Sequence, residues 1–568
     1  MRRTFTTAAI VAALATAACS AGGAAGGTGG ATAGRVTGDL MTANTAKVQP
    51  DTGEITMAIE KTISNWNTMT AAGDISETVW VTTPVYPSVF TIQPDGSTVE
   101  LNQDMMTSAE VVSQHPTVVK YVIKPEATWS DGVPITGADF EYQYQAMNGR
   151  DCPKCQAKDT NGLDRVKSIQ TQDNGKTVTV TYNGDFSEWK RPFSRLLPAH
   201  IAKQHGDLTT SFNDYFAKTV PTFSGGPYRI SDFKKDVSVT LEPNPKWYGR
   251  KPNLQKITFR MITDTQQTPI AMQNGEIQAM YPQPQVDLLS QVTNMEGQGV
   301  AYQMNQSLVM ETFQFNLSNS TLADPALRKA IYTALNRQEI IGKTVGQFDK
   351  DVKPLGSVMI MQQQKGYQSK TEKFGYGDGN VDAAKKILTD AGYTVKDGQL
   401  INPKGVPVPA LRSVYSVGNQ TRKASMEVLQ ATVKQLGITL RLETTDSLGD
   451  TTAENAPYGY DLLIVGYTGS PFLAANAKQR FTTGTGYNKH YSSKKVDGLV
   501  DQALSSTDSA KTVDLINQAD EQVIDDAFMM PLYQKPTLMV YDGKYANIRD
   551  NPTISGPTYN ILEWGLRG

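Results

Sequence analysis

The sequence predicts an α/β protein that is divided into two lobes. Its 568 residues suggest several domains at roughly 150 residues each, and 39% of them are hydrophobic, which is ample for a large core. Strand patterns dominate up to about residue 310, whereas helices alternate with strands from 324 to 526. No internal repeat is visible. This change of pattern predicts two lobes of different build, with a boundary near 305–322.

Three segments predict that the first part of the chain is rich in strands. Residues 51–60 and 117–123 carry β-type patterns, and residues 176–182 alternate between polar and apolar side chains. The Asn174-Gly175 pair directly before the last segment is a signal for a hairpin turn. We therefore expect antiparallel strands in this part of the chain.

The helices of the second part have clearer boundaries. Asp324 is a good N-cap and Pro325 suits the first helical position, and apolar residues then recur along one helix face at Leu327, Ile331 and Leu335. Further helices are predicted in three places: from Asp382 to Gly392, from Ser425 to Leu436, and from Asp508 to Asp525.

The charge balance excludes one class of partner. The chain has 54 Lys and Arg against 56 Asp and Glu, a formal net charge of −2. Nucleic-acid-binding proteins are expected to carry a basic surplus, so we expect no nucleic-acid partner. The chain is also too hydrophobic for an intrinsically disordered protein.

The N-terminus is typical of an export signal. Arg2 and Arg3 precede an apolar run at 8–18 that is too short to span a bilayer. Small residues followed by Cys19 resemble a bacterial lipobox; the alternative is an ordinary secretory signal with a stray cysteine. We predict a lipoprotein signal peptide at 1–18 and, over 19–50, a lipidated Cys19 with a flexible Gly/Ala/Thr linker. The protein would then be anchored to the outer face of the cell membrane.

The remaining cysteines, Cys152 and Cys155, form a Cys-x-x-Cys motif. Such a motif can be redox-active, half of a zinc site, or a short disulfide. Zinc needs two further ligands, and the four histidines are scattered. In an exported protein we favour a structural disulfide and no metal.

Motifs of common enzymes are absent from the sequence. It contains no His-Glu-x-x-His and no Gly-x-Ser-x-Gly elbow. Gly342-Lys343-Thr344 looks like the end of a P-loop, but the required first glycine is replaced by Arg337. We therefore predict a protein that is not an enzyme and needs no cofactor.

Short motifs spread over most of the chain point to one family. Ala127–Phe140 reads Ala-Thr-Trp-Ser-Asp-Gly-Val-Pro-Ile-Thr-Gly-Ala-Asp-Phe. Further motifs follow in order: Ser224–Ile230, Leu241–Gly249, Asn274–Ile277, Asp324–Arg337, Asp382–Tyr393 and Met530–Tyr533. Together they resemble the family 5 extracellular solute-binding proteins, the oligopeptide- and dipeptide-binding receptors of bacterial ABC importers, of an actinobacterial type. The resemblance covers about residues 52–568.

The resemblance implies a type II periplasmic-binding-protein fold, with an extra strand-rich subdomain in the first lobe and a ligand cleft between the lobes. The expected divisions are lobe I at 51–83, 222–305 and 527–568, its inserted subdomain at 84–221, and lobe II at 306–526.

The resemblance also suggests where ligand lies in the second lobe. Peptide-binding relatives carry a Gly-Trp-x-x-Asp segment whose Asp pairs with the ligand's amino group. Tyr467 stands in the aromatic position here and Phe472 follows it, but the acidic region is replaced by Thr468, Gly469 and Ser470. We expect Tyr467 and Phe472 to contact ligand, with core packing as the alternative for Tyr467.

In the first lobe, the resemblance places ligand-facing loops at Trp66 and Asn67, after the first strand, and at Tyr86. Packing in the core or on the surface is the alternative for each. The implied function is capture of oligopeptides by lobe closure and delivery to ABC permease subunits, and we expect the protein to be a monomer. The alternative is the same fold used for a glycolipid of the cell envelope or for a regulatory envelope role.

Overall fold

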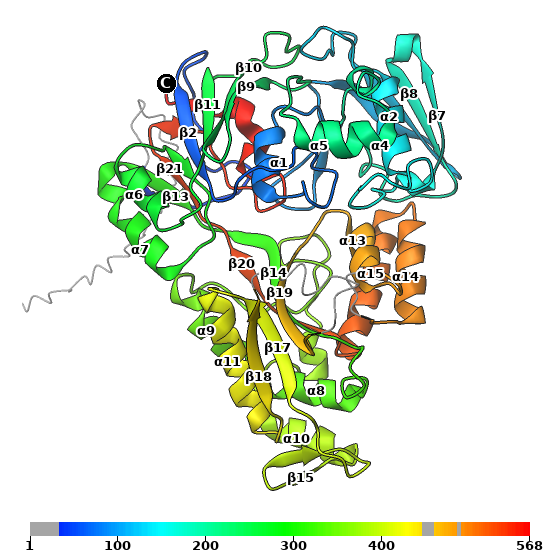
Figure 1. The fold of residues 1–568 in the computed structure, drawn as a ribbon, viewed down its shortest axis with the longest axis vertical. Helices are drawn as coiled ribbons and strands as arrows, with labels where there is room; N and C mark the ends of the chain where they lie inside the picture. The colour runs from blue at the N-terminus through cyan, green and yellow to red at the C-terminus, as the bar shows by residue number, and fades with distance from the viewer. Residues whose placement is uncertain (1–32, 446–458, 486–489) are drawn as a thin grey trace, which may run out of the picture.

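The computed structural model describes residues 33–445, 459–485 and 490–568, and its strands form two main sheets, one in each lobe. Figure 1 shows the first lobe in the upper half and the second lobe below it, with β14 and β20 between them. The predicted signal peptide at 1–18 and Cys19 lie outside the described residues. No helix within the described ranges is long and apolar enough to cross a membrane.

The sheet of the first lobe has eight strands. Their order is β1 (Gly34–Arg35), β13 (Val300–Gln303), β21 (Met539–Asp542), β12 (Ala279–Met280), β2 (Glu54–Ile59), β11 (Lys256–Met261), β10 (Ser238–Pro243) and β9 (Tyr228–Lys234). The central strand β2 runs parallel to both of its neighbours. The helices of this lobe are α1 (Ser76–Thr82), α6 (Gln267–Gln273) and α7 (Val286–Asn294), and a short pair, β22 (Tyr545–Ala546) and β23 (Gly565–Leu566), lies near the C-terminus.

Residues 34–50 belong to the first lobe, so the predicted flexible linker over 19–50 is wrong for its second half. Strand β1 pairs in parallel with β13, and Val48 forms a bridge with Arg567. Asn44 also donates to the carbonyl of Ile548 at 3.2 Å. The low-complexity sequence ends at Gly34, and the more varied residues after it find backbone partners near the C-terminus.

A strand-rich subdomain lies within 84–221. Its sheet has the order β5 (Met106–Gln114), β6 (Thr117–Ile123), β8 (Thr177–Tyr182) and β7 (Val166–Gln172). Helix α2 (Gly137–Met147) begins with a capping box in which the carboxylate of Asp139 accepts from the Thr136 amide at 2.9 Å. The smaller elements are β3 (Phe90–Ile92), β4 (Val99–Leu101), α3 (Ala199–Ala202), α4 (Leu208–Thr210) and α5 (Phe216–Lys218).

The sheet of the second lobe has five strands. Their order is β18 (Leu440–Thr445), β17 (Leu411–Ser416), β19 (Leu462–Thr468), β14 (Gln306–Phe315) and β20 (Met529–Pro536). Its helices are α8 (Pro325–Ala334), α9 (Arg337–Lys343), α10 (Val381–Asp390), α11 (Gln420–Lys434), α13 (Leu473–Phe481), α14 (Lys494–Leu504) and α15 (Ser509–Asp525), and β15 (Thr394–Lys396) and β16 (Gln399–Ile401) form a hairpin.

Local capping explains where these helices begin. The Asp324 carboxylate accepts from the Ala326 amide at 2.9 Å, so α8 starts as predicted. Helix α11 starts five residues before the predicted Ser425, because Asn419 caps it by accepting from the Arg422 amide at 2.9 Å. The last predicted helix is confirmed as α15, whose N-cap is Asp508.

The chain crosses between the lobes twice in the sheet region, and the second crossing corrects a predicted boundary. The first crossing joins β13 to β14 at Met304 and Asn305, and the second joins β20 to β21 at Thr537 and Leu538. Because β20 pairs with β14, residues 529–536 belong to the second sheet. Lobe II therefore does not end at 526 as predicted.

One buried carboxylate ties the two crossings together. Asp550 accepts from Asn305 Nδ2 at 2.8 Å, from the Tyr281 hydroxyl at 2.5 Å, and from the Thr537 hydroxyl. The Thr537 amide also donates to the Asn305 carbonyl at 2.7 Å. Burial raises the pKa of Asp550. This cluster, which we call the hinge cluster, fixes the point about which the lobes can move.

Candidate functional site

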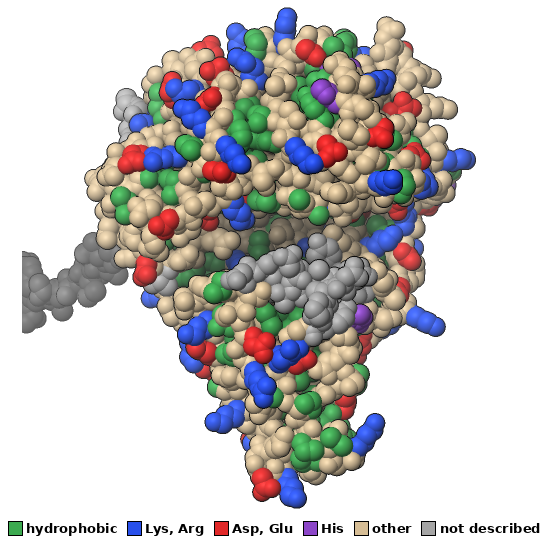
Figure 2. All heavy atoms as spheres, in the orientation of Figure 1, with side chains coloured by type: hydrophobic (Ala, Val, Ile, Leu, Met, Phe, Trp, Pro, Cys, Tyr) green, Lys and Arg blue, Asp and Glu red, His purple; other side chains and the backbone are tan. Residues whose placement is uncertain are grey.

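A large cleft of about 1440 Å³ lies between the two lobes. Figure 2 shows the surface hollowed between the upper and the lower part of the molecule. Most of the lining comes from separate stretches of the chain: 83–93, 99–104, 158–161, 190–195, 225–227 and 553–563 in the first lobe, and 467–472 with Asn476, Gln479 and Arg480 in the second. A ligand in this space would contact both lobes.

The described lining is more positive than the protein as a whole. Its charged residues are eight cations, Lys124, Lys158, Lys190, Arg191, Arg195, Arg250, Arg480 and Arg549, and five carboxylates, Asp74, Glu100, Asp104, Asp159 and Glu563. The lining therefore has a surplus of three positive charges, in a chain whose net charge is −2. Such a surface favours ligands that carry negative charge.

Four of these eight cations have an anionic partner among the described residues. The ion pairs are Lys158 with Asp74 at 2.8 Å, Arg191 with Asp159 at 3.0 Å, Arg250 with Asp104 at 2.9 Å, and Arg549 with Glu563 at 2.8 Å. Arg250 holds the pKa of Asp104 below its usual range although burial acts in the opposite direction. Because each pair is neutral as a unit, the positive surplus of the lining lies with the remaining charged residues, Lys124, Lys190, Arg195 and Arg480 against Glu100.

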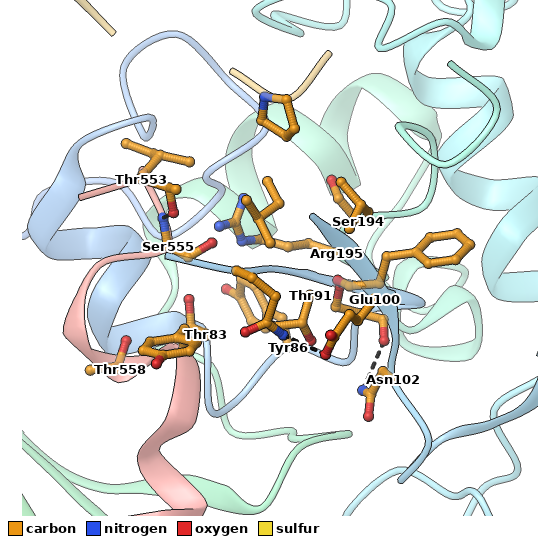
Figure 3. A pocket seen from close by; sticks show the side chains of 18 of the residues that line it. Thr83, Tyr86, Thr91, Glu100, Asn102, Ser194, Arg195, Thr553, Ser555 and Thr558 are labelled. Atoms are coloured by element: carbon orange, nitrogen blue, oxygen red, sulfur yellow. Dashed lines mark hydrogen bonds between the residues drawn. The ribbon is translucent and has the colours of Figure 1, made fainter. Parts of the chain in front are cut away.

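Arg195 is different from the other arginines of the cleft. Among the described residues, none accepts a hydrogen bond from its guanidinium and no carboxylate lies within 4.0 Å of it. Burial lowers its pKa, while Asp74 and Tyr86 act in the opposite direction. In Figure 3 the side chain of Arg195 points into the pocket, among polar side chains that include Ser194 and Ser555.

The backbone around Arg195 is held firmly. Phe193 and Leu196 on either side of it are fully buried, and the Leu196 amide donates to the Pro87 carbonyl at 2.8 Å. Phe193 also has a φ of 59°, an uncommon conformation for a bulky residue that the surrounding core must maintain. The position of Arg195 at the cleft is therefore set by packing on both sides.

The second lobe contributes a narrower and mostly neutral wall. Tyr467 donates to Gln314 Oε1 at 2.7 Å, so its hydroxyl is directed toward the neighbouring strand β14. Arg480 lies over that ring, 4.9 Å from its centroid, and donates to the Thr468 carbonyl at 2.5 Å. The Gly469 amide pairs with the Leu308 carbonyl at 2.7 Å. This wall presents aromatic and backbone surface to the cleft.

The lobes also touch each other beside the cleft. Glu188 of the inserted subdomain accepts from the amides of Ala474 at 2.7 Å and Ala475 at 3.1 Å, at the N-terminus of α13. Burial raises the pKa of Glu188 to about 7. The Ser187 hydroxyl donates to the Ala503 carbonyl at 3.0 Å, at the end of α14. The structure thus has its lobes in contact.

Three of the predicted ligand residues line the cleft. Tyr86, Tyr467 and Phe472 are part of its wall, the first from lobe I and the others from lobe II. Tyr86 is almost fully buried, and its hydroxyl already donates to the Trp66 carbonyl at 3.0 Å. Its contribution to the cleft is therefore the face or edge of its ring. That these residues contact ligand stays a prediction.

Trp66 and Asn67 do not line the cleft, so the prediction that they face ligand is wrong. Trp66 is buried edge-to-face against Phe233, with ring centroids 5.2 Å apart. Asn67 is fully buried and its amide donates to the Phe212 carbonyl at 2.9 Å. The loop after β2 turns under the inserted subdomain, where its polar groups find backbone partners.

The two other cysteines are bonded to each other. The Cα atoms of Cys152 and Cys155 are 5.3 Å apart and their sulfurs form a disulfide, in a loop that contacts Thr209. Neither residue lines the cleft. Within the part of the chain that the structure describes, no group of three or more His, Cys, Asp or Glu side chains is placed to hold a metal ion.

Sequence reasoning missed Arg195. It lies in Arg-Pro-Phe-Ser-Arg, a stretch without a recognisable site motif. Arg195 differs from the other arginines of the cleft because it has no ion-pair partner among the described residues. This property depends on residues far away in the sequence: Asp74, for example, is already paired with Lys158. No pattern of spacing could have revealed it.

Comparisons with known proteins agree with the predicted family. The model for bacterial extracellular solute-binding proteins, family 5, matches residues 100–489. The chain is 27% identical over 522 residues to the oligopeptide-binding protein OppA of Mycobacterium tuberculosis, covering 90% of this chain and 84% of the relative. It is also 29% identical over 259 residues, 44% of this chain and 39% of the relative, to a probable monoacyl phosphatidylinositol tetramannoside-binding protein, LpqW, of the same species.

A solved structure is similar over nearly the whole chain. It is the periplasmic EDTA-binding protein EppA, with a TM-score of 0.90 and 36% identity, covering 94% of this chain and 100% of that one. The predicted two-lobed periplasmic-binding-protein fold is thereby confirmed. From the family match and this similarity, the chain belongs to the bacterial extracellular solute-binding proteins of family 5.

Proposed function

We propose that this protein is the substrate-binding lipoprotein of an ABC importer, which captures oligopeptides by lobe closure and delivers them to a membrane permease. The observation that carries the proposal is the cleft, whose walls come from both lobes. A ligand that contacts both walls binds the closed form more tightly than the open form and shifts the population toward it. Closure about the hinge cluster then provides the signal that a permease can recognise.

The peptide assignment draws on size and on relatives. A volume of about 1440 Å³ exceeds the range of about 300–1,000 Å³ that is typical of drug-sized ligands. The relative OppA, named as an oligopeptide-binding protein, matches most of the chain. Micromolar affinity corresponds to about −8 kcal/mol, which a few hydrogen bonds and enclosed apolar area can supply.

The protein would act outside the cell and without chemistry of its own. Capture and release need no chemistry, so we propose a non-enzymatic role without cofactor or metal. Lipid on Cys19 would anchor the chain at the outer face of the cell membrane, where the disulfide of Cys152 and Cys155 would persist. We propose a monomer, whose partners are the ligand and the permease subunits.

Native mass spectrometry tests the peptide assignment. A Cys19→Ala variant is exported without lipid and purified without added ligand, and the masses released on denaturation are measured. A heterogeneous set of short peptides is the expected result. A single glycolipid mass, or a single small anion, would overturn the peptide assignment.

Two alternatives have specific support. A glycolipid or regulatory envelope role is favoured by the partial similarity to LpqW, which is named as a probable glycolipid-binding protein. A small anionic chelate is favoured by the similarity to EppA, named as EDTA-binding, and by the positive surplus of the cleft lining. The released masses separate all three classes of ligand.

A further inference from the structure

We infer that Arg195 binds a carboxylate group of the captured ligand, so that the protein selects acids. The inference rests on the proposed function, because it names the chemistry of the ligand that the cleft would enclose. It adds a binding residue and a ligand class that neither the fold nor the size of the cleft specifies.

Arg195 is half-buried and has no carboxylate partner among the described residues. Closure of the cleft without an anion would take its guanidinium further out of water, which is unfavourable because hydration is lost and no ion pair is gained. The other arginines of the described lining avoid this cost: Arg191, Arg250 and Arg549 pair with carboxylates, and Arg480 donates to a carbonyl. Arg195 alone among them keeps an unsatisfied charge toward the cleft. An anionic ligand would remove that cost when the cleft closes.

Two groups of the chain act electrostatically on Arg195, and neither is free to neutralise it. The carboxylate among them is Asp74, which forms an ion pair with Lys158 at 2.8 Å. Tyr86 is neutral, because burial raises the pKa of its hydroxyl, and that hydroxyl donates to the Trp66 carbonyl. Neither of these groups can serve as the missing anion.

The geometry of Arg195 also suits a carboxylate. Phe193 and Leu196 hold the backbone on both sides of it, so the side chain starts from a fixed point at the cleft. A guanidinium offers a planar set of donors that matches the two oxygens of a carboxylate. Because its donors are fixed in one plane, a guanidinium loses less conformational entropy per hydrogen bond formed than a lysine does.

The inference also accounts for the departure from the peptide-binding pattern in the second lobe. Thr468, Gly469 and Ser470 occupy the stretch where an acidic residue would pair with a ligand's amino group. Four of the five described carboxylates of the cleft, Asp74, Asp104, Asp159 and Glu563, are in ion pairs. The fifth, Glu100, accepts from Gln93 Nε2 at 2.8 Å and lies on the first-lobe wall, not in the second-lobe stretch where the acidic residue would stand. Recognition at the acidic end of the ligand takes the place of recognition at its amino end.

The experiment measures binding to the complete Cys19→Ala protein and to the same protein with Arg195→Gln. The probes are a pool of alanine oligopeptides of graded length as free acids, the same pool as C-terminal amides, and citrate. Affinities are measured by calorimetry and by the shift in melting temperature. The matched control is Arg229→Gln, which removes an arginine from an exposed ion pair with Glu242 outside the cleft.

We expect the free acids to bind, and Arg195→Gln to weaken them about 10- to 100-fold, the range for a charge-assisted hydrogen-bonded pair. The amides should bind the unsubstituted protein about as weakly as the acids bind Arg195→Gln. Arg195→Lys should recover part of the loss, since lysine keeps the charge but not the planar pairing. Arg229→Gln should leave every affinity unchanged.

The outcomes separate the inference from the proposed function. Equal binding of acids and amides, unaffected by Arg195→Gln, would overturn the inference and support the peptide receptor. Citrate binding that depends on Arg195, without any peptide binding, would support the inference and overturn the peptide assignment. A protein that binds none of the probes, or binds citrate equally well after Arg195→Gln, would overturn the inference.

Discussion

The two walls of the cleft are built differently. The first-lobe wall, formed by the lining residues before 251 and after 548, carries seven of the eight described cations and all five carboxylates. The second-lobe wall, at 467–480, has Arg480 as its one described charged side chain, and that side chain lies over Tyr467. From this difference we infer that the first wall recognises the charge of the ligand and that the second wall encloses the ligand.

The largest effect is expected from a substitution in the hinge cluster, which keeps the two walls opposite each other. Asp550→Ala removes the acceptor shared by Tyr281, Asn305 and Thr537, in a fully buried place. We expect a loss of about 3–5 kcal/mol in the free energy of unfolding, as for other broken buried networks. Urea unfolding followed by circular dichroism measures it.

Asp550→Asn is the matched control for this prediction. It keeps one acceptor oxygen and nearly the same volume, so it should destabilise the protein less than alanine does. An alanine variant within about 1 kcal/mol of the unsubstituted protein would show that the hinge cluster is not needed to hold the crossings.

The second prediction concerns contact between the lobes. Burial against α13 raises the pKa of Glu188 from 4.5 to about 7, and Arg191 and Arg165, which face it, act in the opposite direction. Because the carboxyl binds its proton more tightly when the lobes touch, its contribution to closure is fully present below pH 4.5. It is lost as the pH rises toward about 7, by an amount of the order of 1–3 kcal/mol.

Small-angle X-ray scattering of the empty protein across this pH range measures the effect as a larger radius of gyration at high pH. Glu188→Gln should remove the dependence, since it cannot titrate. Glu60→Gln is the control: the pKa of Glu60 is also raised to about 7, but by burial and by Glu77 within the first lobe. The prediction fails if the Glu188→Gln protein still expands with pH.

The third prediction compares the effects on stability of removing an unpaired charge and of breaking an ion pair on the first-lobe wall. Arg195→Met removes an unpaired cation and should raise the free energy of unfolding of the empty protein by about 1 kcal/mol. Asp159→Asn leaves Arg191 without its partner at 3.0 Å and should lower it by about 1 kcal/mol. Thermal unfolding of ligand-free protein should show opposite shifts, and shifts of the same sign would refute the distinction.

The smallest effect is expected on the second-lobe wall. Tyr467→Phe removes the hydroxyl that donates to Gln314 at 2.7 Å but keeps the ring. We expect about 0.5–1.5 kcal/mol less stability and no change in ligand affinity beyond twofold, because the hydroxyl points into the sheet. Tyr467→Ala serves as the comparison. If the phenylalanine variant loses as much affinity as the alanine variant, the wall recognises ligand through a polar group.

The parts of the fold that depend on local chemistry were predictable. The start of α8 follows from Asp324 and Pro325, and that of α15 from Asp508, because a cap needs only residues within one turn. The boundary at 527 was wrong, because the sheet to which β20 belongs is decided by its pairing with β14, more than 200 residues earlier in the chain. Pairing partners at that distance leave no local pattern.

The sequence by itself determined the class of protein: an α/β chain with capped helices in its second part and family motifs spread along most of its length. Only the tertiary structure decided which side chains face ligand. Trp66 and Asn67 satisfy their contacts in the core, at Phe233 and Phe212. Arg195 stands out because its neighbours are already paired with one another. Whether a polar group is satisfied depends on every residue around it in space, and a linear pattern does not contain that information.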